Sequence, residues 1–215
     1  MKTKKDTKDL LLEITFDEVY TYGYQGTSVL KILEKAELNK GSLYHYFKNK
    51  KELVLAAIDI KSEEIFGQKY KDVLNGNAPY LENFEKMLIN MYEFAAPRGC
   101  PLANLIQEMS NNDEEFDILL KNKYQALKNI IEEILKKAIE NNELTSDNLD
   151  DLSLFVLSGI EGSILSAKAF KNKDIYDLID FIESLSTEYK LFCYHHPLTH
   201  HEIEYYFVNK KLYKD

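Results

Sequence analysis

Two short helices joined by a tight turn are encoded between residues 27 and 47, and this pattern limits the fold most. The first helix repeats apolar side chains at the i, i+3, i+4, i+7 spacing of an amphipathic helix. These apolar residues are Val29, Ile32, Leu33 and Ala36. We expect Thr27 to cap this helix and Asn39 to cap the second, in which Leu43 and Phe47 lie one turn apart.

The second helix has an unusual outer face. The residues that point away from its apolar pair, or flank that face, are Gly41, Ser42, Tyr44, His45 and Tyr46. Glycine lets a DNA duplex approach the backbone, while serine, histidine and tyrosine can donate hydrogen bonds to phosphates or base edges. The pattern predicts a helix laid against DNA. The alternative is an ordinary helical hairpin with solvated polar residues.

Flanking residues add a family resemblance. With Phe16, Gly23 and Tyr24 upstream and FKNKKEL at 47–53 downstream, the stretch resembles the DNA-binding domain of the TetR family of bacterial transcriptional regulators. This resemblance implies that residues 40–46 form the recognition helix. It also implies that residues at the start of the preceding helix contact the DNA backbone and that a lysine at the start of the following helix contacts a phosphate. The DNA-contacting residues expected are Thr27, Ser28, Lys40, Gly41, Ser42, Tyr44, His45, Tyr46 and Lys50.

One position departs from the family pattern. Glu37 stands where the family usually has glycine, at a place that helix C-termini like to fill with a left-handed residue. A glutamate there implies strain or a slightly different turn. The pitch of the recognition helix depends on that turn.

Charge and composition are those of a soluble globular protein. Of 215 residues, 45% are hydrophobic and 29% charged, and no apolar run approaches the roughly 20 residues that span a bilayer. We therefore expect a cytoplasmic protein without a membrane partner. The net charge is −9, but residues 1–52 hold ten lysines against eight acidic residues, so this part is +2 and the remainder −11. We call residues 1–52 the tip and the rest of the chain the body. A mildly basic tip on an acidic body is compatible with DNA binding.

Helical patterns cover almost the whole chain, which predicts an all-α fold: an N-terminal three-helix, homeodomain-like helix-turn-helix domain and a C-terminal helical ligand-binding and dimerisation domain. We expect domains at 1–52 and 53–190, and a C-terminal extension at 191–215. The predicted helices span 7–22, 27–36, 40–46, 50–74, 80–95, 101–110, 113–141, 147–171 and 174–190. The helix at 50–74 has no break, so it would connect the DNA-binding tip stiffly to the body.

Small residues at 147–171 point to dimerisation. Each glycine inside a helix lowers helix stability by about 1 kcal/mol relative to alanine. The two glycines here, Gly159 and Gly162, therefore indicate that another element packs closely against the helix backbone. A second copy of the helix would pack there with helix 174–190, as the family resemblance also implies. The residues expected at this homodimer interface are Phe155, Gly159, Gly162, Ser163, Ser166, Ala167 and Ile182. A helix buried within one subunit is the alternative.

Aromatic and methionine residues in the middle of the chain could line a cavity for a small-molecule effector. The residues expected there are Phe84, Met87, Met91, Tyr92, Cys100, Met109, Phe116 and Tyr124. Cys100 follows Arg98 and precedes a helix opened by Pro101, two influences expected to lower its thiol pKa. It resembles a Gly-Cys-Leu stretch found in TetR proteins, some of which sense electrophiles or oxidants. A small buried apolar residue is the alternative.

Other sites receive little support. His195, His196, His200 and His201 cluster around Pro197, but the proline prevents one helical face, so no metal site is predicted. Cys193 has no disulfide or zinc spacing with Cys100. No catalytic or cofactor motif occurs, so we expect neither an enzyme nor a cofactor.

Together these patterns predict a transcriptional regulator, released from a palindromic operator in double-stranded DNA by a small molecule or by modification of Cys100. The first alternative is a helical small-molecule-binding protein or enzyme without specific DNA binding. The second is an architectural DNA-associated protein without an inducer.

Overall fold

The computed structural model describes residues 4–95 and 97–171, and this part of the chain forms helices and no strand. The all-α prediction is therefore confirmed. The elements are α1 (Lys4–Gly26), α2 (Val29–Ala36), α3 (Lys40–Tyr44), α4 (Lys50–Ser62), η1 (Glu63–Gly67), α5 (Gln68–Asn75), α6 (Tyr80–Ala95), α7 (Pro101–Met109), α8 (Glu114–Glu140) and α9 (Leu149–Phe170). The predicted helix at 174–190 with Ile182, and the extension at 191–215, lie outside the described residues.

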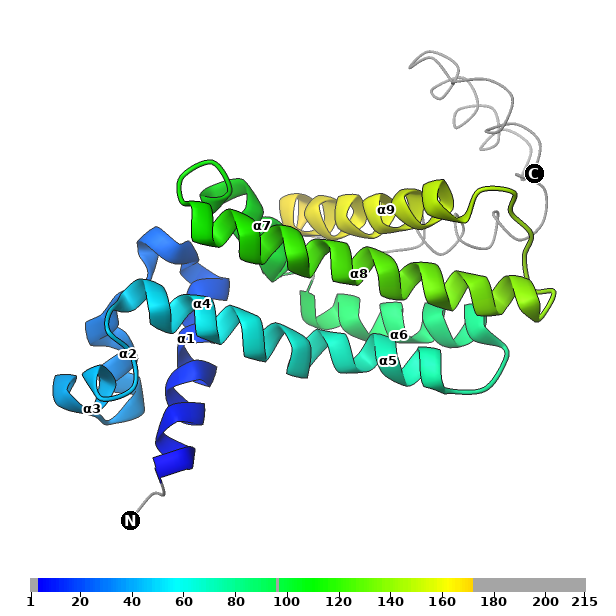
Figure 1. The fold of residues 1–215 in the computed structure, drawn as a ribbon. Helices are drawn as coiled ribbons and strands as arrows, with labels where there is room; N and C mark the ends of the chain where they lie inside the picture. The colour runs from blue at the N-terminus through cyan, green and yellow to red at the C-terminus, as the bar shows by residue number, and fades with distance from the viewer. Residues whose placement is uncertain (1–3, 96, 172–215) are drawn as a thin grey trace.

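The helices form an elongated molecule with α2 and α3 at one end (Figure 1). The long helices α8 and α9 run side by side, while α4, η1 and α5 follow one another along the same axis. The predicted connector at 50–74 is thus continuous in direction. Its middle, however, is a π-helical segment, Glu63–Gly67, that the apolar pattern did not reveal. Such segments are rare insertions into α-helices and often lie at functional sites.

Two hydrophobic clusters hold the described helices together. One lies in the body and joins residues of α5, α6, α8 and α9. The other joins α1 to α4 with the α7 and α8 residues Leu102, Leu105, Met109, Phe116 and Leu120. The N-terminal helices therefore share a core with two body helices. Because a packed core moves as a unit, a shift of α7 would also displace the helices α1 to α4 that share this core.

The turn between α2 and α3 depends on a left-handed glutamate. Glu37 has φ 56° and ψ 42°, so the expectation of a left-handed residue there is confirmed. The Leu38 N–H donates to the Leu33 carbonyl at 3.0 Å, and the Glu37 N–H donates to the Glu34 carbonyl at 3.2 Å. These two bonds form a Schellman motif, which ends α2 and aims the chain into α3.

Replacing Glu37 with glycine should stabilise the protein, because a side chain in the left-handed region costs about 1 kcal/mol. We expect the free energy of unfolding, measured by urea denaturation, to rise by up to about 1 kcal/mol in Glu37→Gly. The control is Glu34→Gly, three residues earlier inside α2, which should lose about 1 kcal/mol. A loss in both variants would contradict the assigned turn.

Candidate nucleic-acid interface and its connection to the body

Helix α3 is anchored through one face. The Asn39 side chain caps it by accepting a hydrogen bond from the Ser42 N–H at 2.9 Å, as predicted. Leu43 is 0% exposed and Phe47 4% exposed, and both belong to the core that α1 to α4 share with α7 and α8. The expected apolar anchor of the second helix is therefore confirmed.

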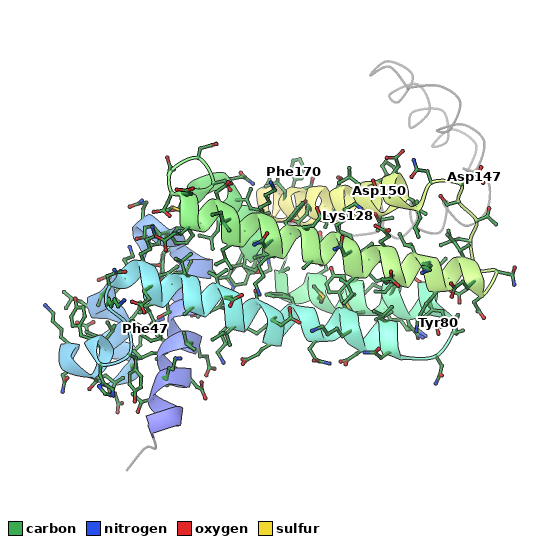
Figure 2. All side chains as sticks on the ribbon, in the orientation of Figure 1. Phe47, Tyr80, Lys128, Asp147, Asp150 and Phe170 are labelled. Carbon is green, nitrogen blue, oxygen red and sulfur yellow. The ribbon has the colours of Figure 1, made fainter. Side chains whose placement is uncertain are left out.

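The opposite face of α3 is open to solvent. The Tyr44 side chain is 56% exposed, and Lys40, Gly41 and His45 are also exposed. Ser42 and Tyr46 are half-buried. The side chains of one face can therefore reach a groove while those of the other stay in the core. Figure 2 shows this region at the end of the molecule, near the labelled Phe47.

Thr27 departs from its predicted role. The N-cap position of α2 belongs to Ser28, which makes no side-chain capping hydrogen bond. Thr27 is 4% exposed, and its hydroxyl donates to the Gly23 carbonyl at 2.6 Å. This hydroxyl proton is already used within the chain, so it has none to donate to a phosphate. Thr27 holds the turn between α1 and α2.

Lys50, at the start of α4, also interacts within the protein. Its ammonium group donates to the Tyr24 carbonyl and lies 4.4 Å from the centre of the Tyr24 ring. Partial burial lowers its pKa, a shift that nearby Glu108 opposes. Asn49 caps α4 by accepting from the Glu52 N–H at 2.9 Å, so this lysine sits on a well-ordered helix start. Its phosphate contact stays a prediction.

A carboxylate from the body holds the end of α1. Gly23 has φ 72°, and this kink turns the N–H groups of Tyr24 and Gln25 away from the helix ladder. The two oxygens of Glu108, on α7, accept these N–H groups at 2.8 Å each. A Cβ at Gly23 would lie 2.5 Å from Glu108 Oε2, so a side chain there would displace this carboxylate, and the positive φ would strain it as well. The sequence pattern includes Gly23 but gives no signal for Glu108, because the two residues are distant in the chain.

A second group of contacts ties the loop before α7 to α1. The Arg98 guanidinium donates to Asp17 at 2.7 Å and lies 4.0 Å from the centre of the Tyr20 ring. The Tyr20 hydroxyl in turn donates to the Gly99 carbonyl. Helix α7 is thus bonded to α1 on both sides: through the loop before its first residue and through Glu108 near its last. Movement of α7 therefore reaches the α1–α2 junction directly.

The loop after α7 is bonded to the start of α4. The Lys51 ammonium lies 2.7 Å from an Asp113 oxygen and 2.6 Å from a Glu115 oxygen. These ion pairs keep α8 beside α4. Exposed pairs contribute little to stability individually, so their main effect is to fix position.

The lowered thiol pKa expected for Cys100 is wrong. Burial raises the pKa of the Cys100 thiol, the Glu161 carboxylate raises it further, and the N–H groups of Ala103 and Leu102 offset only part of this. Arg98, its neighbour in sequence, turns toward Asp17. A thiol in these surroundings stays protonated and reacts slowly. A sensing role for Cys100 stays a prediction, and it would first require the body to open.

The predicted effector-cavity residues separate into two groups. Phe84, Met87, Met91 and Tyr92 share the body core, and the partly buried Tyr124 and Cys100 pack against it. Met109 and Phe116 instead belong to the core beneath the N-terminal helices, so their placement in one cavity with the others is wrong. Met87 also lines an open groove of about 420 Å³ between α5 and α6.

Helix α9 presents an apolar outer face. Four large side chains of α9 are exposed in the described structure: Leu154, Phe155, Leu165 and Phe170. A Cβ added to Gly162 would meet no atom within 4 Å, so this glycine is open to an approaching surface. Ala167 is 5% exposed and faces the body core, which corrects its predicted place at the interface. Figure 2 labels Phe170 at the end of this helix.

In the part of the chain that the structure covers, α9 is the one helix long and apolar enough to cross a membrane by length and composition. About a third of it is buried inside the protein. A helix that packs in a core on one side and against a protein partner on the other has the same composition.

Family models match both halves of the chain. Residues 11–57 match the model of bacterial regulatory proteins of the tetR family, and residues 78–179 match the model of the tetracyclin repressor-like C-terminal domain. AcuR, a transcriptional regulator of Cereibacter sphaeroides, is 30% identical over 163 residues, 74% of each chain.

The chain belongs to the TetR family. It is a DNA-binding transcriptional regulator.

Solved structures agree on the fold of this TetR-family regulator. The reduced form of NemR from Escherichia coli has a TM-score of 0.70 at 20% identity, covering 84% of this chain and 97% of NemR. A cysteine mutant of CifR, in complex with a 26-base-pair operator, has a TM-score of 0.68 at 21% identity, covering 84% and 95% of the two chains. NemR is named as a transcriptional repressor.

Removing the Glu108 carboxylate should loosen the N-terminal helices of the regulator. Two hydrogen bonds to a charged acceptor are lost in Glu108→Ala, and we expect the free energy of unfolding to fall by about 1–3 kcal/mol. The control is Gln107→Ala, at an exposed position of the same helix. Hydrogen exchange should be faster at Tyr24 and Gln25 in the Glu108 variant alone. Unchanged protection of these amides would contradict the contact.

Proposed function

We propose that this TetR-family regulator is a repressor that binds a palindromic operator as a homodimer and leaves it when a small molecule enters the body. The observation that carries the proposal is the division of α3 into a buried face, Leu43 with Phe47, and an exposed face with Tyr44 and His45. Support comes from NemR, named a repressor, and from CifR in its operator complex.

In this proposal α3 enters the major groove. Gly41 permits close approach, while Lys40, Ser42, Tyr44 and His45 meet phosphates and base edges. Tyr46, half-buried, packs edge-to-face against His45 with ring centres 4.9 Å apart, which orients the imidazole. Ser28 and Lys50 would reach the backbone from the starts of α2 and α4. For Lys50 this requires exchanging the Tyr24 carbonyl for a phosphate.

Dimerisation follows from operator geometry and from α9. Two recognition helices about 34–36 Å apart can read successive major grooves, which a single short helix cannot do. The exposed α9 side chains and Gly162 provide a surface on which a second copy can pack. The remaining proposed interface residues are Gly159, Ser163 and Ser166.

Release from DNA would use the contacts of α7. A ligand held among Phe84, Met91 and Tyr92 touches α6 in the core that α6 shares with α8 and α9, and α8 in turn packs against α7. If it prefers a body in which α7 is displaced, Glu108 and the shared core carry that displacement to α1 and α2. The ligand then weakens DNA binding by its own differential affinity for the two states.

The proposal includes the domain division at residues 1–52, 53–190 and 191–215 and a location in the cytoplasm. The extension at 191–215 lies beyond the described structure. We assign the chain no catalytic role, because DNA binding and ligand-controlled release require no reaction.

Tyr44→Ala should weaken operator binding at least about tenfold, because a groove contact worth about 1–3 kcal/mol is lost. Its helicity and melting temperature should not change, since the side chain touches little of the protein. The operator would be found by genome-wide footprinting and the affinity measured by fluorescence anisotropy. Tyr22→Ala is the matched control, because Tyr22 is 54% exposed on α1 and lies outside α3. Wild-type affinity in Tyr44→Ala would mean that α3 is not the reading helix.

Leu165→Glu should convert the dimer to monomers and reduce operator affinity, because a charge would be buried without a partner at the interface. Leu165 is 54% exposed on α9, so a glutamate there leaves a lone protomer folded. Ultracentrifugation measures the mass, and Ile89→Glu on α6 is the control at another exposed apolar residue. Dimers of unchanged affinity in Leu165→Glu would place the interface elsewhere.

A further inference from the structure

A half-buried glutamate of the body has one carboxylate oxygen that is buried without a partner in the described structure. Glu161 is on α9, and its Oε2 atom is buried and accepts no hydrogen bond in the described structure. Among the described residues the carboxylate has the Cys100 thiol as a hydrogen-bonding partner, and burial raises the pKa of the carboxyl group. Native proteins seldom bury a charged oxygen in this way, because an unmet acceptor costs free energy.

Two phenols share this interior with Glu161. Tyr70, from α5, is 2% exposed within the body core, and Tyr124, from α8, packs against the same core. Burial raises the pKa of both phenols, and the Glu161 carboxylate and the Cys100 thiol raise it further, so all four groups lie within electrostatic reach. Helices α5, α8 and α9 thus direct polar groups toward one region of an otherwise apolar body.

Aromatic rings and methionines surround these polar groups. The Tyr70 ring contacts the Phe84 ring, with centres 6.1 Å apart, and Met91 and Tyr92 belong to the same core. A carboxylate and phenol oxygens accept hydrogen bonds from an ammonium group, and aromatic faces attract the cation as well. Neutral and anionic molecules gain less binding free energy at this position. The carboxylate repels an anion, and beside a neutral molecule its charge stays uncompensated.

We propose that Glu161, together with the phenol oxygens of Tyr70 and Tyr124, binds the ammonium group of a small organic amine, and that amines are the class of effector for this regulator. The ammonium would donate to Glu161 Oε2 and to one phenol while the rest of the ligand lies against the rings. The regulatory part rests on the proposed function, whereas amine binding does not.

The site is connected to the DNA-binding end through α7. Cys100, the hydrogen-bonding partner of Glu161, is the residue immediately before α7, and Glu108 near the other end of α7 holds Tyr24 and Gln25. An ammonium bound to Oε2 draws the Glu161 carboxylate toward the phenols and away from the Cys100 thiol, so that the bond to Cys100 is broken. The start of α7 then loses a contact to α9, which favours the displaced arrangement.

The first experiment compares ligands of one shape and different charge on the full chain. Benzylamine and phenethylamine are tested beside neutral benzyl alcohol and anionic phenylacetate, by thermal denaturation and titration calorimetry. We expect the two amines to raise the melting temperature in proportion to the logarithm of their concentration. The alcohol and the acid should not. Equal shifts by benzylamine and benzyl alcohol, or no shift by either amine, would overturn the amine site.

The second experiment removes the charge. Glu161→Gln keeps the shape of the side chain and should weaken amine binding at least tenfold, while the melting temperature without ligand stays the same or rises. Glu133→Gln, at an exposed position on α8, is the control and should bind amines as the wild type does. Tyr124→Phe is a second variant, and we expect it to weaken amine binding several-fold. If Glu161→Gln binds amines normally and melts at a lower temperature, the carboxylate is structural.

The two proposals fail in different ways. Operator binding is measured in parallel without amine. A wild type that binds its operator but ignores amines overturns the effector assignment and leaves the regulator in place. A wild type that binds amines but no genomic DNA overturns the proposed function and leaves the amine site in place.

Discussion

The burial of Leu43 and Phe47 beneath α3 is the contact on which the rest of the structure depends. A helix of five residues is too short to be stable alone, so its direction is set by the core into which it is packed. That core also contains Leu105 of α7 and Phe116 of α8. The core beneath the reading face is therefore continuous with residues of α7 and α8, so a change at these two helices can reach α3 through that core.

The polar contacts around α7 make this dependence specific. An apolar core permits small sliding movements, whereas the Glu108 carboxylate fixes two backbone amides at the Gly23 kink. Arg98 adds a second attachment on α1, and Lys51 ties α4 to the α7–α8 loop. Helix α7 thus lies between the interior of the body and the α1–α2 junction.

Local patterns in the sequence predicted the local structure well. The Asn39 cap, the left-handed Glu37 and the two faces of α3 are properties of neighbouring residues, and all three are confirmed. Contacts between distant residues could not be seen in this way. Arg98 precedes Cys100 in sequence but turns to Asp17, so the predicted thiol activation failed, and Glu108 gave no sign that it would face Gly23. Met109 and Phe116 looked like cavity residues because an apolar stripe does not say which core it enters.

Footprinting of the bound operator tests the central claim most directly. The purified protein is placed on its strongest genomic site, and protection of guanine N7 atoms from methylation is read base by base, since these atoms lie in the major groove. The account predicts two protected patches in successive major grooves, about one helical turn apart and related by twofold symmetry. No protection of guanine N7 atoms on a bound operator would show that the exposed face of α3 does not read the major groove, and a single patch without symmetry would contradict the homodimer.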